Sequence, residues 1–324
     1  MIKIGLIGTG HLGKIHLRLL KELTDEYEIV GFYDQNPQVA AAIAAEFQVP
    51  AYDDMNRLID HCEALDVVAT TTAHYEIARK VVTQSKHLFI EKPLTATLEE
   101  ARSLVSLVNE ANVKCQVGHV ERFNPAIRAL EGLNLRPIYI EVQRSKAPWN
   151  PRGTDVSVVL DLTIHDIEIV QYLVKSPVKR VVATGTPVVS QSADIVFARI
   201  EFHNGAVANL NTNRVAFTPA RVMRIYERNR HVEVDMGAST ARVYHFQEQL
   251  PANFAGQHVS FDGAHLPLVA TIEDLVVLPS NAIKDELKTF AQAILENKQT
   301  PVTVEDGANA IDTAFQIIQR IENQ

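Results

Sequence analysis

Residues 2–16, IKIGLIGTGHLGKIH, decide the fold of this chain. An apolar strand is expected at residues 2–7, and it leads into the glycine loop Gly8-Thr-Gly-His-Leu-Gly13 and then into an amphipathic helix. The spacing G-x-G-x-x-G at a strand-to-helix junction is typical of a dinucleotide-binding βαβ unit. There the first glycine permits a tight turn, the second lets the backbone approach a pyrophosphate, and the third allows close helix–strand packing. The alternative is a glycine-rich turn that binds no ligand.

The second strand of this unit, residues 28–33, ends at Asp34. Asp34 follows Gly13 by 21 residues, which is where a carboxylate accepts hydrogen bonds from the adenosine ribose. Its negative charge repels the 2′-phosphate of NADP, and Gln35 and Asn36 supply no arginine to offset that repulsion. The sequence therefore favours NAD over NADP as the cofactor.

Length and composition limit the class of protein. With 324 residues, two domains are favoured over one. Hydrophobic residues make up 46% of the chain and charged residues 22%, which is enough apolar mass for sizeable cores. The formal net charge of −8 argues against a nucleic-acid groove or an anionic membrane surface as the main partner, but leaves room for an anionic small ligand.

Other features point to a cytoplasmic globular protein. Cys62 and Cys115 have no metal or redox spacing, so each is expected to be a small buried hydrophobic residue. No apolar run approaches the ~18 residues that span a bilayer. The first residues, MIKIGLIGTG, run directly into a strand, so no signal peptide is expected.

The pattern of the chain changes after Gly118. Up to that point apolar strands alternate with helices, which predicts a Rossmann-type, doubly wound parallel sheet over residues 1–118 with helices on both faces. Between residues 178 and 246 the pattern has period two, and His203-Asn-Gly205 is a hairpin signal. We therefore predict an α/β chain whose second domain, residues 119–324, is α+β with a large, open, mainly antiparallel sheet. Two helices are expected near its end, at 281–296 and after Thr303.

Lys92 is the first candidate catalytic residue. The strand at residues 87–90 ends in Glu91-Lys92-Pro93, and ligands of a doubly wound sheet bind at the carboxyl ends of the strands. A lysine there can hydrogen-bond the alcohol that gives up hydride, or stabilise charge as it develops on the oxygen. An ordinary solvated charge is the alternative.

Asp161 and His165 are the second candidate group. They stand at i and i+4 in a predicted helix over residues 161–173 and so project from one face. A histidine exchanges a proton near neutral pH, and a neighbouring carboxylate can orient it or hold substrate hydroxyls. A structural pair or a metal pair are the alternatives, and because no third ligand is clustered nearby we predict no metal. His119, just past Gly118, can line the cleft.

These motifs together resemble the Gfo/Idh/MocA family of nicotinamide-dependent oxidoreductases, over nearly the whole chain. The resemblance rests on the glycine loop with His16, on Glu91-Lys92-Pro93, on Arg122-Phe-Asn-Pro125, on Asp161-x-x-x-His165, and on the closing residues 285–314. It implies that Lys92 and His165 are the catalytic pair and that Asp161 helps to hold a sugar or cyclitol. It also implies a cis Lys92–Pro93 bond. Thr71 departs from the family pattern, because many relatives have proline there.

A narrower likeness links three segments, GHVERFNPA, DLTIHDIEIVQYL and PARVMRIYERNRHVEVDM, to members assigned as UDP-N-acetylglucosamine 3-dehydrogenases. Four cations, Arg144, Lys146, Arg152 and Arg214, can offer charge to a diphosphate, although the sequence favours a surface cation for each of them individually.

The residue-level predictions follow from these patterns. The predicted cofactor-binding residues are Gly8, Thr9, Gly10, His11, Leu12, Gly13, Asp34, Thr70, Thr71, His74, Glu91 and Lys92. Among them His11 and His74, like His16, are expected to cap or pack rather than to react. The predicted substrate-binding residues are His119, Arg122, Asn124, Arg152, Asp161 and His165.

The sequence predicts an NAD-dependent dehydrogenase acting on a secondary alcohol of a sugar, in particular C3 of a nucleotide sugar such as UDP-N-acetylglucosamine. His165 would remove the hydroxyl proton, Lys92 would polarise the oxygen, and Asp161 would orient His165 or bind a neighbouring hydroxyl. The alternatives are a free-sugar or cyclitol dehydrogenase and a catalytically silent, NAD-sensing regulator. One open face on an antiparallel sheet suits a partner sheet, so a homodimer or tetramer is expected.

Overall fold

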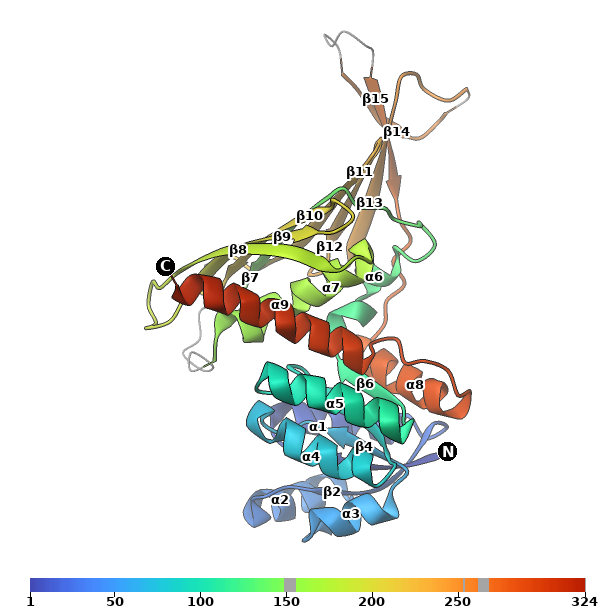
Figure 1. Ribbon diagram of the computed structural model, residues 1–324. Helices are drawn as coiled ribbons and strands as arrows, with labels where there is room; N and C mark the ends of the chain where they lie inside the picture. The colour runs from blue at the N-terminus through green and yellow to red at the C-terminus, as the bar shows by residue number, and fades with distance from the viewer. Residues whose placement is uncertain (149–155, 253, 262–267, 324) are drawn as a thin grey trace. The chain divides into compact units, whose positions relative to one another are not determined.

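The computed structural model describes residues 1–148, 156–252, 254–261 and 268–323 (Figure 1). Contacts divide the chain into two compact units. Unit 1 consists of Met1–Phe123 and Asn281–Asp312, and unit 2 of Asn124–Ser280 and Thr313–Gln324. This division places residues 281–312 with the N-terminal unit, whereas the sequence assigned them to the second domain.

Unit 1 is built on a six-stranded sheet in which every pair of neighbours is parallel. The strands lie in the order β3 (Ala51–Tyr52), β2 (Tyr27–Tyr33), β1 (Ile2–Ile7), β4 (Ala64–Val67), β5 (His87–Glu91) and β6 (Cys115–Gly118). This order reverses direction between β1 and β4, as in a Rossmann sheet, and the predicted doubly wound fold is confirmed. Ligands of such sheets bind at this reversal, at the carboxyl ends of the strands.

Helices cover both faces of this sheet. The helices α1 (His11–Glu22), α2 (Pro37–Phe47) and α8 (Ala282–Leu295) share one apolar core with the sheet, in which Phe89 meets Phe290 edge to face at 5.8 Å. Right-handed crossovers place α4 (Thr71–Thr83) and α5 (Leu98–Ala111), which pack on each other, on the opposite face. The remaining helices of unit 1 are the short α3 (Met55–His61) and the 3₁₀ turn η1 (Val120–Phe123).

The ends of these helices follow ordinary capping chemistry. Asn36 precedes Pro37 and accepts hydrogen bonds from two backbone N–H groups of α2. Thr97 and Glu100 form a capping box at the start of α5. Caps of this kind satisfy backbone donors that have no partner inside a helix. These caps determine where α2 and α5 begin.

Unit 2 contains a nine-stranded sheet. Its order is β14 (Gln257–Phe261), β15 (Leu268–Asp274), β13 (Thr240–Gln247), β12 (Arg230–Asp235), β11 (Ala220–Glu227), β7 (Tyr139–Ser145), β10 (Val207–Asn213), β9 (Ile195–Phe202) and β8 (Val178–Thr186). Among the described strands of this nine-stranded sheet, only β7 and β10 pair in parallel. The predicted large and mainly antiparallel sheet is confirmed, and its hairpin turn contains Gly205 at φ 88°.

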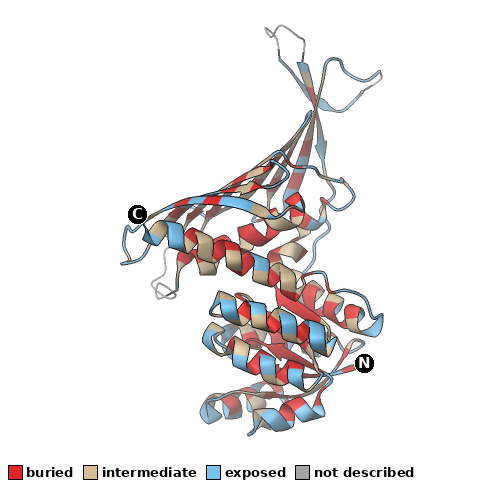
Figure 2. Ribbon diagram, viewed as in Figure 1, coloured by how far each residue is buried: buried red, intermediate tan, exposed pale blue. Residues whose placement is uncertain are grey.

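The central strands of this sheet, such as β7 and β10, alternate buried residues, red in Figure 2, with partly or fully exposed ones, tan or pale blue. Ile140 and Val142 of β7 are buried, whereas the alternate residues Glu141 and Gln143 face outward. The helices of this unit are α6 (Pro125–Arg128), the π-helical η2 (Val159–Thr163) and α7 (Ile164–Val174). The last helix, α9 (Val304–Glu322), begins in unit 1 and ends in unit 2.

Two expectations about single features are also answered. Cys62 and Cys115 are both buried free thiols, and burial raises the pKa of Cys62 to about 12. Among the helices that the structure describes, none is long and apolar enough to cross a membrane.

Candidate active site

The glycine loop between β1 and α1 has the geometry that a dinucleotide requires. Gly8 has φ 96°, and a Cβ there would lie 2.8 Å from the backbone of Ala69 and from the carbonyl of Val68. A Cβ on Gly13 would lie 2.1 Å from the carbonyl oxygen of Gly8. Around Gly10, in contrast, the described chain leaves open space: apart from its neighbours, nothing lies within 4 Å of an added Cβ. The backbone is therefore accessible at the position expected to approach a pyrophosphate.

The helix that follows the loop presents free N–H groups. Gly10 is the N-cap of α1, and no side chain in the described part of the chain caps it. Orphan N–H groups and the helix dipole together favour a bound anion. His11 and Leu12 form the first turn of α1, with His11 exposed.

Asp34 is held against the glycine loop. Its Oδ2 accepts hydrogen bonds from the amide of Thr9 at 2.9 Å and from the hydroxyl of Thr9 at 2.7 Å, and its Oδ1 accepts from the amide of Asn36 at 2.9 Å. Partial burial alone would raise the pKa of Asp34, but these donors outweigh it and hold the pKa below its usual value. Asp34 is thus an ionised acceptor at the end of β2.

His74 links two loops at the same edge of the sheet. Its ring is buried, with Nδ1 2.9 Å from the carbonyl oxygen of Pro93 and Nε2 3.0 Å from that of Ala69. Burial lowers the pKa of His74, while the two carbonyls oppose that shift. Thr70 is the N-cap of α4 and Thr71 is its first residue. A helix therefore begins at Thr71, although many relatives have proline at this position. His74 packs as expected and ties the exit of β4 to the turn after β5.

Lys92 follows β5 directly. It is half-buried, and its amide donates to the side chain of Glu91 at 3.1 Å. The Lys92–Pro93 bond is cis, as the family resemblance implied. Glu91 pairs with Gly118 of β6. Lys92 therefore lies at the carboxyl end of β5, at the edge of the unit 1 sheet where ligands bind.

His119 and Arg122 lie just beyond β6. His119 is buried, and burial, with the nearby charges of Arg122 and Lys92, lowers its pKa to about 3. Neither ring nitrogen of His119 has a hydrogen-bond partner among the described residues. Arg122 donates to the carbonyl of Pro301 at 3.1 Å and lies 3.9 Å from Asp306. His119 is therefore a neutral group beside Lys92.

The side chain of Asn124 makes hydrogen bonds to the backbone of unit 2. Its Oδ1 accepts from the amide of Ala126 at 3.0 Å, which caps α6, and its Nδ2 donates to the carbonyl of Met236 at 3.2 Å. The predicted substrate-binding role of Asn124 stays a prediction, and the bonds described here are structural.

Asp161 and His165 stand on a modified helix start. Asp161 belongs to the π-helical segment η2, and His165 to the first turn of α7, so the helix predicted over 161–173 does not begin as an α-helix. The 3.6-residue pattern does not distinguish a π-turn, and such turns are frequent at functional sites. The Asp161 side chain is 33% exposed and lies 3.5 Å from the ammonium of Lys146.

The four cations considered for a diphosphate differ in burial. Lys146 is exposed beside Asp161, whereas Arg144 and Arg214 are buried. Arg144 is buried and makes a two-pronged ion pair with Asp166, at 2.8 and 2.7 Å. Arg214 is also buried, and its Nε donates to Asp194 at 2.8 Å. Burial and these ion pairs correct the reading of both arginines as surface cations, and a role toward a diphosphate stays a prediction. Arg152 lies outside the described residues.

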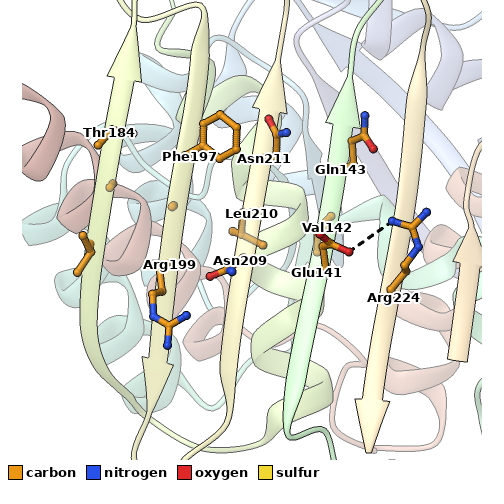
Figure 3. Close-up of a pocket in the computed structure, with 13 residues that line it drawn as sticks. Glu141, Val142, Gln143, Thr184, Phe197, Arg199, Asn209, Leu210, Asn211 and Arg224 are labelled. Carbon is orange, nitrogen blue, oxygen red and sulfur yellow. Dashed lines mark hydrogen bonds and ion pairs between the residues drawn. The ribbon is translucent and has the colours of Figure 1, made fainter. Parts of the chain in front are cut away.

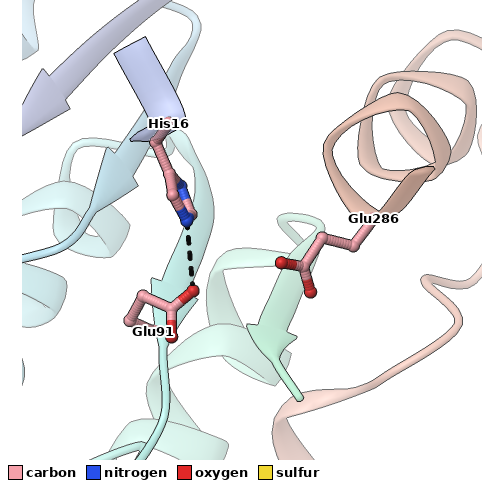
Figure 4. Close-up of side chains that lie close together, drawn as sticks. All are labelled: His16, Glu91 and Glu286. Carbon is pink, nitrogen blue, oxygen red and sulfur yellow. Dashed lines mark ion pairs between the residues drawn. The ribbon is translucent and has the colours of Figure 1, made fainter. Parts of the chain in front are cut away.

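The sequence reading missed one feature of unit 1, a cluster of buried ionisable side chains (Figure 4). Its members are His16, Asp66, Glu91 and Glu286. Asp66 inside the apolar strand β4 was the available signal, because a buried carboxylate requires a partner. The partner, His16, comes from α1 and was not predictable without the fold.

A Rossmann sheet with this glycine loop is typical of a dinucleotide-binding domain. Comparison with known families agrees: residues 2–119 match "Oxidoreductase family, NAD-binding Rossmann fold", and residues 128–233 match "GFO/IDH/MocA C-terminal domain". The chain belongs to the Gfo/Idh/MocA oxidoreductase family. It is a dehydrogenase that acts on CH–OH groups.

Individual relatives extend over most of the chain. UDP-N-acetylglucosamine 3-dehydrogenase of Acidithiobacillus ferrooxidans is 34% identical over 245 residues, covering 75% of this chain and 77% of that one. A solved structure of UDP-N-acetylglucosamine 3-dehydrogenase from that organism matches 99% of this chain and 98% of its own, with a TM-score of 0.89 at 29% identity. A scyllo-inositol 2-dehydrogenase (NAD(+)) of Bacillus subtilis is 26% identical over 66% of this chain and 68% of its own.

Proposed function

We propose that this enzyme transfers hydride between a secondary alcohol of a nucleotide sugar, in particular C3 of UDP-N-acetylglucosamine, and the nicotinamide of NAD. The observation that carries the proposal is the likeness to the Acidithiobacillus dehydrogenase, which holds over both units and not over the cofactor domain alone. The motifs in GHVERFNPA and DLTIHDIEIVQYL support the same reading from the sequence.

The proposed roles follow from the chemistry of each side chain. His165 removes the hydroxyl proton as the carbon gives up hydride, because a histidine accepts a proton near neutral pH. Lys92 stabilises the charge that develops on the oxygen. Asp161, which is partly exposed beside Lys146, orients His165 or binds a neighbouring hydroxyl. His119, neutral at physiological pH, is left to donate or accept a substrate hydrogen bond.

NAD is the proposed cofactor, and when bound it accepts the hydride at its nicotinamide ring. The open space at Gly10 and the uncapped start of α1 suit its pyrophosphate. Asp34 would accept hydrogen bonds from the adenosine ribose. The ionised state of Asp34 also supports NAD over NADP, since a carboxylate repels a 2′-phosphate.

A free-sugar or cyclitol dehydrogenase is the second candidate. The specific observation in its favour is the match to scyllo-inositol 2-dehydrogenase, which also covers both units. A catalytically silent regulator is disfavoured, because Lys92 and His165 are both present. The cytoplasm remains the proposed location.

A homodimer through the outward face of the unit 2 sheet is the proposed assembly. Phe197 and Val182 are 54% and 42% exposed on this face. Both side chains line a depression of about 380 Å³ formed by β7 to β11, in which Arg224 pairs with Glu141 (Figure 3). Tyr226 stacks on His231 at 4.4 Å in the same layer. A face that mixes exposed apolar, aromatic and paired charged groups suits a second copy of itself.

The test of the proposed function is a substrate panel read by NADH absorbance. UDP-N-acetylglucosamine and other UDP-sugars are compared with inositols and free aldoses at equal NAD. Turnover confined to UDP-sugars supports the proposal, and turnover confined to inositols or aldoses selects the second candidate. Thermal stabilisation by NAD without turnover of any substrate would revive the regulator.

A further inference from the structure

Four buried ionisable side chains meet in unit 1 at the exit of β5, next to the turn that carries Lys92. Figure 4 shows three of them, His16, Glu91 and Glu286. His16, Asp66, Glu91 and Glu286 are 0%, 0%, 6% and 1% exposed. We propose that they form a positioning network for Lys92, in which a doubly protonated His16 is held between Asp66 and Glu91 and Glu286 is protonated. The proposal rests on the proposed function, because it is the role of Lys92 in the reaction that gives the network a purpose.

The contacts of His16 favour an additional proton. Its Nδ1 is hydrogen-bonded to Oδ2 of Asp66 at 3.0 Å. Its Nε2 has no hydrogen bond among the described residues but lies at ion-pair distance, 3.3 Å, from Oε1 of Glu91. A neutral imidazole has one N–H and can donate to only one of these carboxylates. The other nitrogen would present a lone pair to a carboxylate oxygen, which is unfavourable in a buried site. An imidazolium donates to both.

Electrostatics act on both partners of the His16–Asp66 contact. Burial raises the pKa of Asp66, while the charge and hydrogen bond of His16 oppose that shift. Burial alone would lower the pKa of His16, but the charges and hydrogen bonds of Asp66 and Glu91 outweigh it and raise the pKa well above its usual value. The charges of the cluster also affect the pKa values of two neighbouring groups. Burial and Asp66 raise the pKa of Tyr27 on β2, and Glu91 opposes the lowering by burial of the pKa of His74 on α4. Tyr27 donates its hydroxyl to the carbonyl of Leu287 at 2.6 Å and stays neutral. His16 is thus the cation of the cluster.

Glu91 connects this cation to Lys92. One carboxylate oxygen faces His16, and the other accepts the backbone N–H of Lys92 at 3.1 Å. The carboxylate also lies against Gly118, where an added Cβ would be 2.5 Å from Oε1. The rotamer of Glu91 is therefore fixed from two sides, by His16 and by the β6 backbone. Without the His16 contact, a buried Glu91 would lose its charge compensation and with it the orientation of the Lys92 amide.

Glu286 enters the cluster from α8. Its carboxyl, with His16 and Glu91, gives three ligand-type atoms within 4.8 Å of one another. Oε2 of Glu286 has no hydrogen-bond partner among the described residues. Burial raises the pKa of Glu286 well above its usual value, and the charges of Glu91 and Asp66 add to this effect. A third carboxylate beside one imidazolium would bury excess negative charge, so the neutral acid is the favoured form.

The same three side chains are also a conceivable set of ligands for a divalent cation. The ion-pair contact between His16 and Glu91 favours the proton, and so does the hydrogen bond from the Lys92 amide to the second Glu91 oxygen. Elemental analysis of the purified enzyme, before and after dialysis against a chelator, separates the two. Stoichiometric metal that is lost in Glu286→Gln would overturn the proposal.

The decisive variants are His16→Gln and His16→Asn. A glutamine amide nitrogen can take the place of Nε2 and keep the bond to Glu91, whereas an asparagine amide nitrogen can take the place of Nδ1 and keep only the bond to Asp66. With whichever substrate the panel identifies, kcat should fall ~10-fold or more in His16→Asn and within ~3-fold in His16→Gln, with the Kd of NAD nearly unchanged in both. Equal kcat in the two variants would show that the contact to Glu91 does not position Lys92.

A second readout does not require a substrate. Reductive ¹³C-methylation gives each lysine an NMR signal, and the Lys92 signal is assigned by its loss in Lys92→Arg. In the NAD-bound enzyme this signal should shift in His16→Asn and stay in place in His16→Gln. An unmoved signal in His16→Asn would overturn the network. Unchanged turnover in both Lys92→Ala and His165→Ala would instead refute the proposed function. In that case the lysine signal would still report on the network.

Glu286→Gln tests the protonated acid by itself. Glutamine has nearly the same shape as the neutral acid, so the variant should keep its Tm within ~2 °C and its kcat within ~2-fold. Glu286→Ala, which leaves a cavity, serves as the matched control for packing. A large loss of stability in Glu286→Gln that matches the loss in Glu286→Ala would show that the ionised carboxylate is needed, contrary to the proposal.

Discussion

Thr9 and Asp34 are joined by two hydrogen bonds to the same carboxylate oxygen, one from the amide of Thr9 at 2.9 Å and one from its hydroxyl at 2.7 Å. The acid that ends β2 is thereby fixed to the glycine loop that follows β1. Because the loop would receive the pyrophosphate and the acid the ribose, one small unit would recognise two adjacent parts of the adenosine diphosphate. Cofactor choice and loop geometry are therefore coupled.

The first prediction concerns cofactor choice. Asp34→Ala should raise the KM for NAD by ~10-fold or more, because the ribose loses a charged acceptor worth roughly 1.5–3 kcal/mol. The ratio of activity with NADP to activity with NAD should rise in the same variant, since the repulsion of the 2′-phosphate is removed. Steady-state kinetics with both cofactors measure this. Asp60→Ala, which removes an exposed acid from α3 in the same unit, should leave both values unchanged.

The second prediction separates two glycines of the loop. A Cβ on Gly13 would overlap the carbonyl oxygen of Gly8, so Gly13→Ala should lower the free energy of unfolding by ~1–3 kcal/mol. A Cβ on Gly10 meets no described atom within 4 Å beyond its neighbours, and φ there is −62°. Gly10→Ala should therefore keep the stability and weaken NAD binding. Calorimetry and NAD titration test both, and tight NAD binding by Gly10→Ala would contradict the placement of the pyrophosphate.

The third prediction is a pH dependence of stability from Asp194 in unit 2. Burial alone would raise its pKa, but the N–H groups of Ser190 and Val189 and the guanidinium of Arg214 outweigh it and lower the pKa. A lowered pKa in the folded state means that the stabilisation is present above the usual value of 3.8 and is lost as the pH falls further. Asp194→Asn should thus be less stable than the wild type near neutral pH, and the difference should shrink below about pH 4.

Urea unfolding of both proteins at several pH values measures the difference. A gap that stays constant from neutral pH to pH ~3 would show that the pKa of Asp194 is not lowered in the folded state. Asp60→Asn is the matched control, because its carboxylate is exposed and the difference from wild type should be small at every pH.

The fourth prediction concerns the outward face of the unit 2 sheet. Phe197→Asp should convert the proposed dimer to a monomer, because it places a charge on an exposed apolar position of that face. Light scattering after size exclusion reports the mass. Phe217→Asp is the control, since Phe217 is fully exposed and lies outside the strands of the sheet. A monomeric wild type, or a Phe197→Asp variant that remains a dimer, would contradict the assignment.

Much of the fold was predictable because its signals are local. The glycine loop, the acid at the end of β2 and the alternation of strands and helices predicted the Rossmann sheet, and the period-two pattern with a hairpin at His203-Asn-Gly205 predicted the second sheet. What could not be predicted depends on contacts between distant segments. Arg144 looks like a surface cation in the sequence, and only the fold brings Asp166 of α7 to it.

The candidate site shows the same limit. The position of Lys92 followed from one strand end, whereas its support by His16 and Glu91 joins α1 to β5 across 75 residues. The π-helical start of the segment that carries Asp161 also escaped the sequence reading, because its apolar spacing is compatible with an ordinary helix. Local patterns thus indicated the candidate residues, and the fold showed how they are held.

The measurement that tests the central claim most directly is the rate of NADH formation from UDP-N-acetylglucosamine and NAD by the wild type and by His165→Ala. His203→Ala, an exposed histidine in a turn, is the control. We expect turnover by the wild type and the control, and a fall of ~10²-fold or more in His165→Ala with NAD binding unchanged. Equal turnover by wild type and His165→Ala, or no turnover of any UDP-sugar by the wild type, would contradict it.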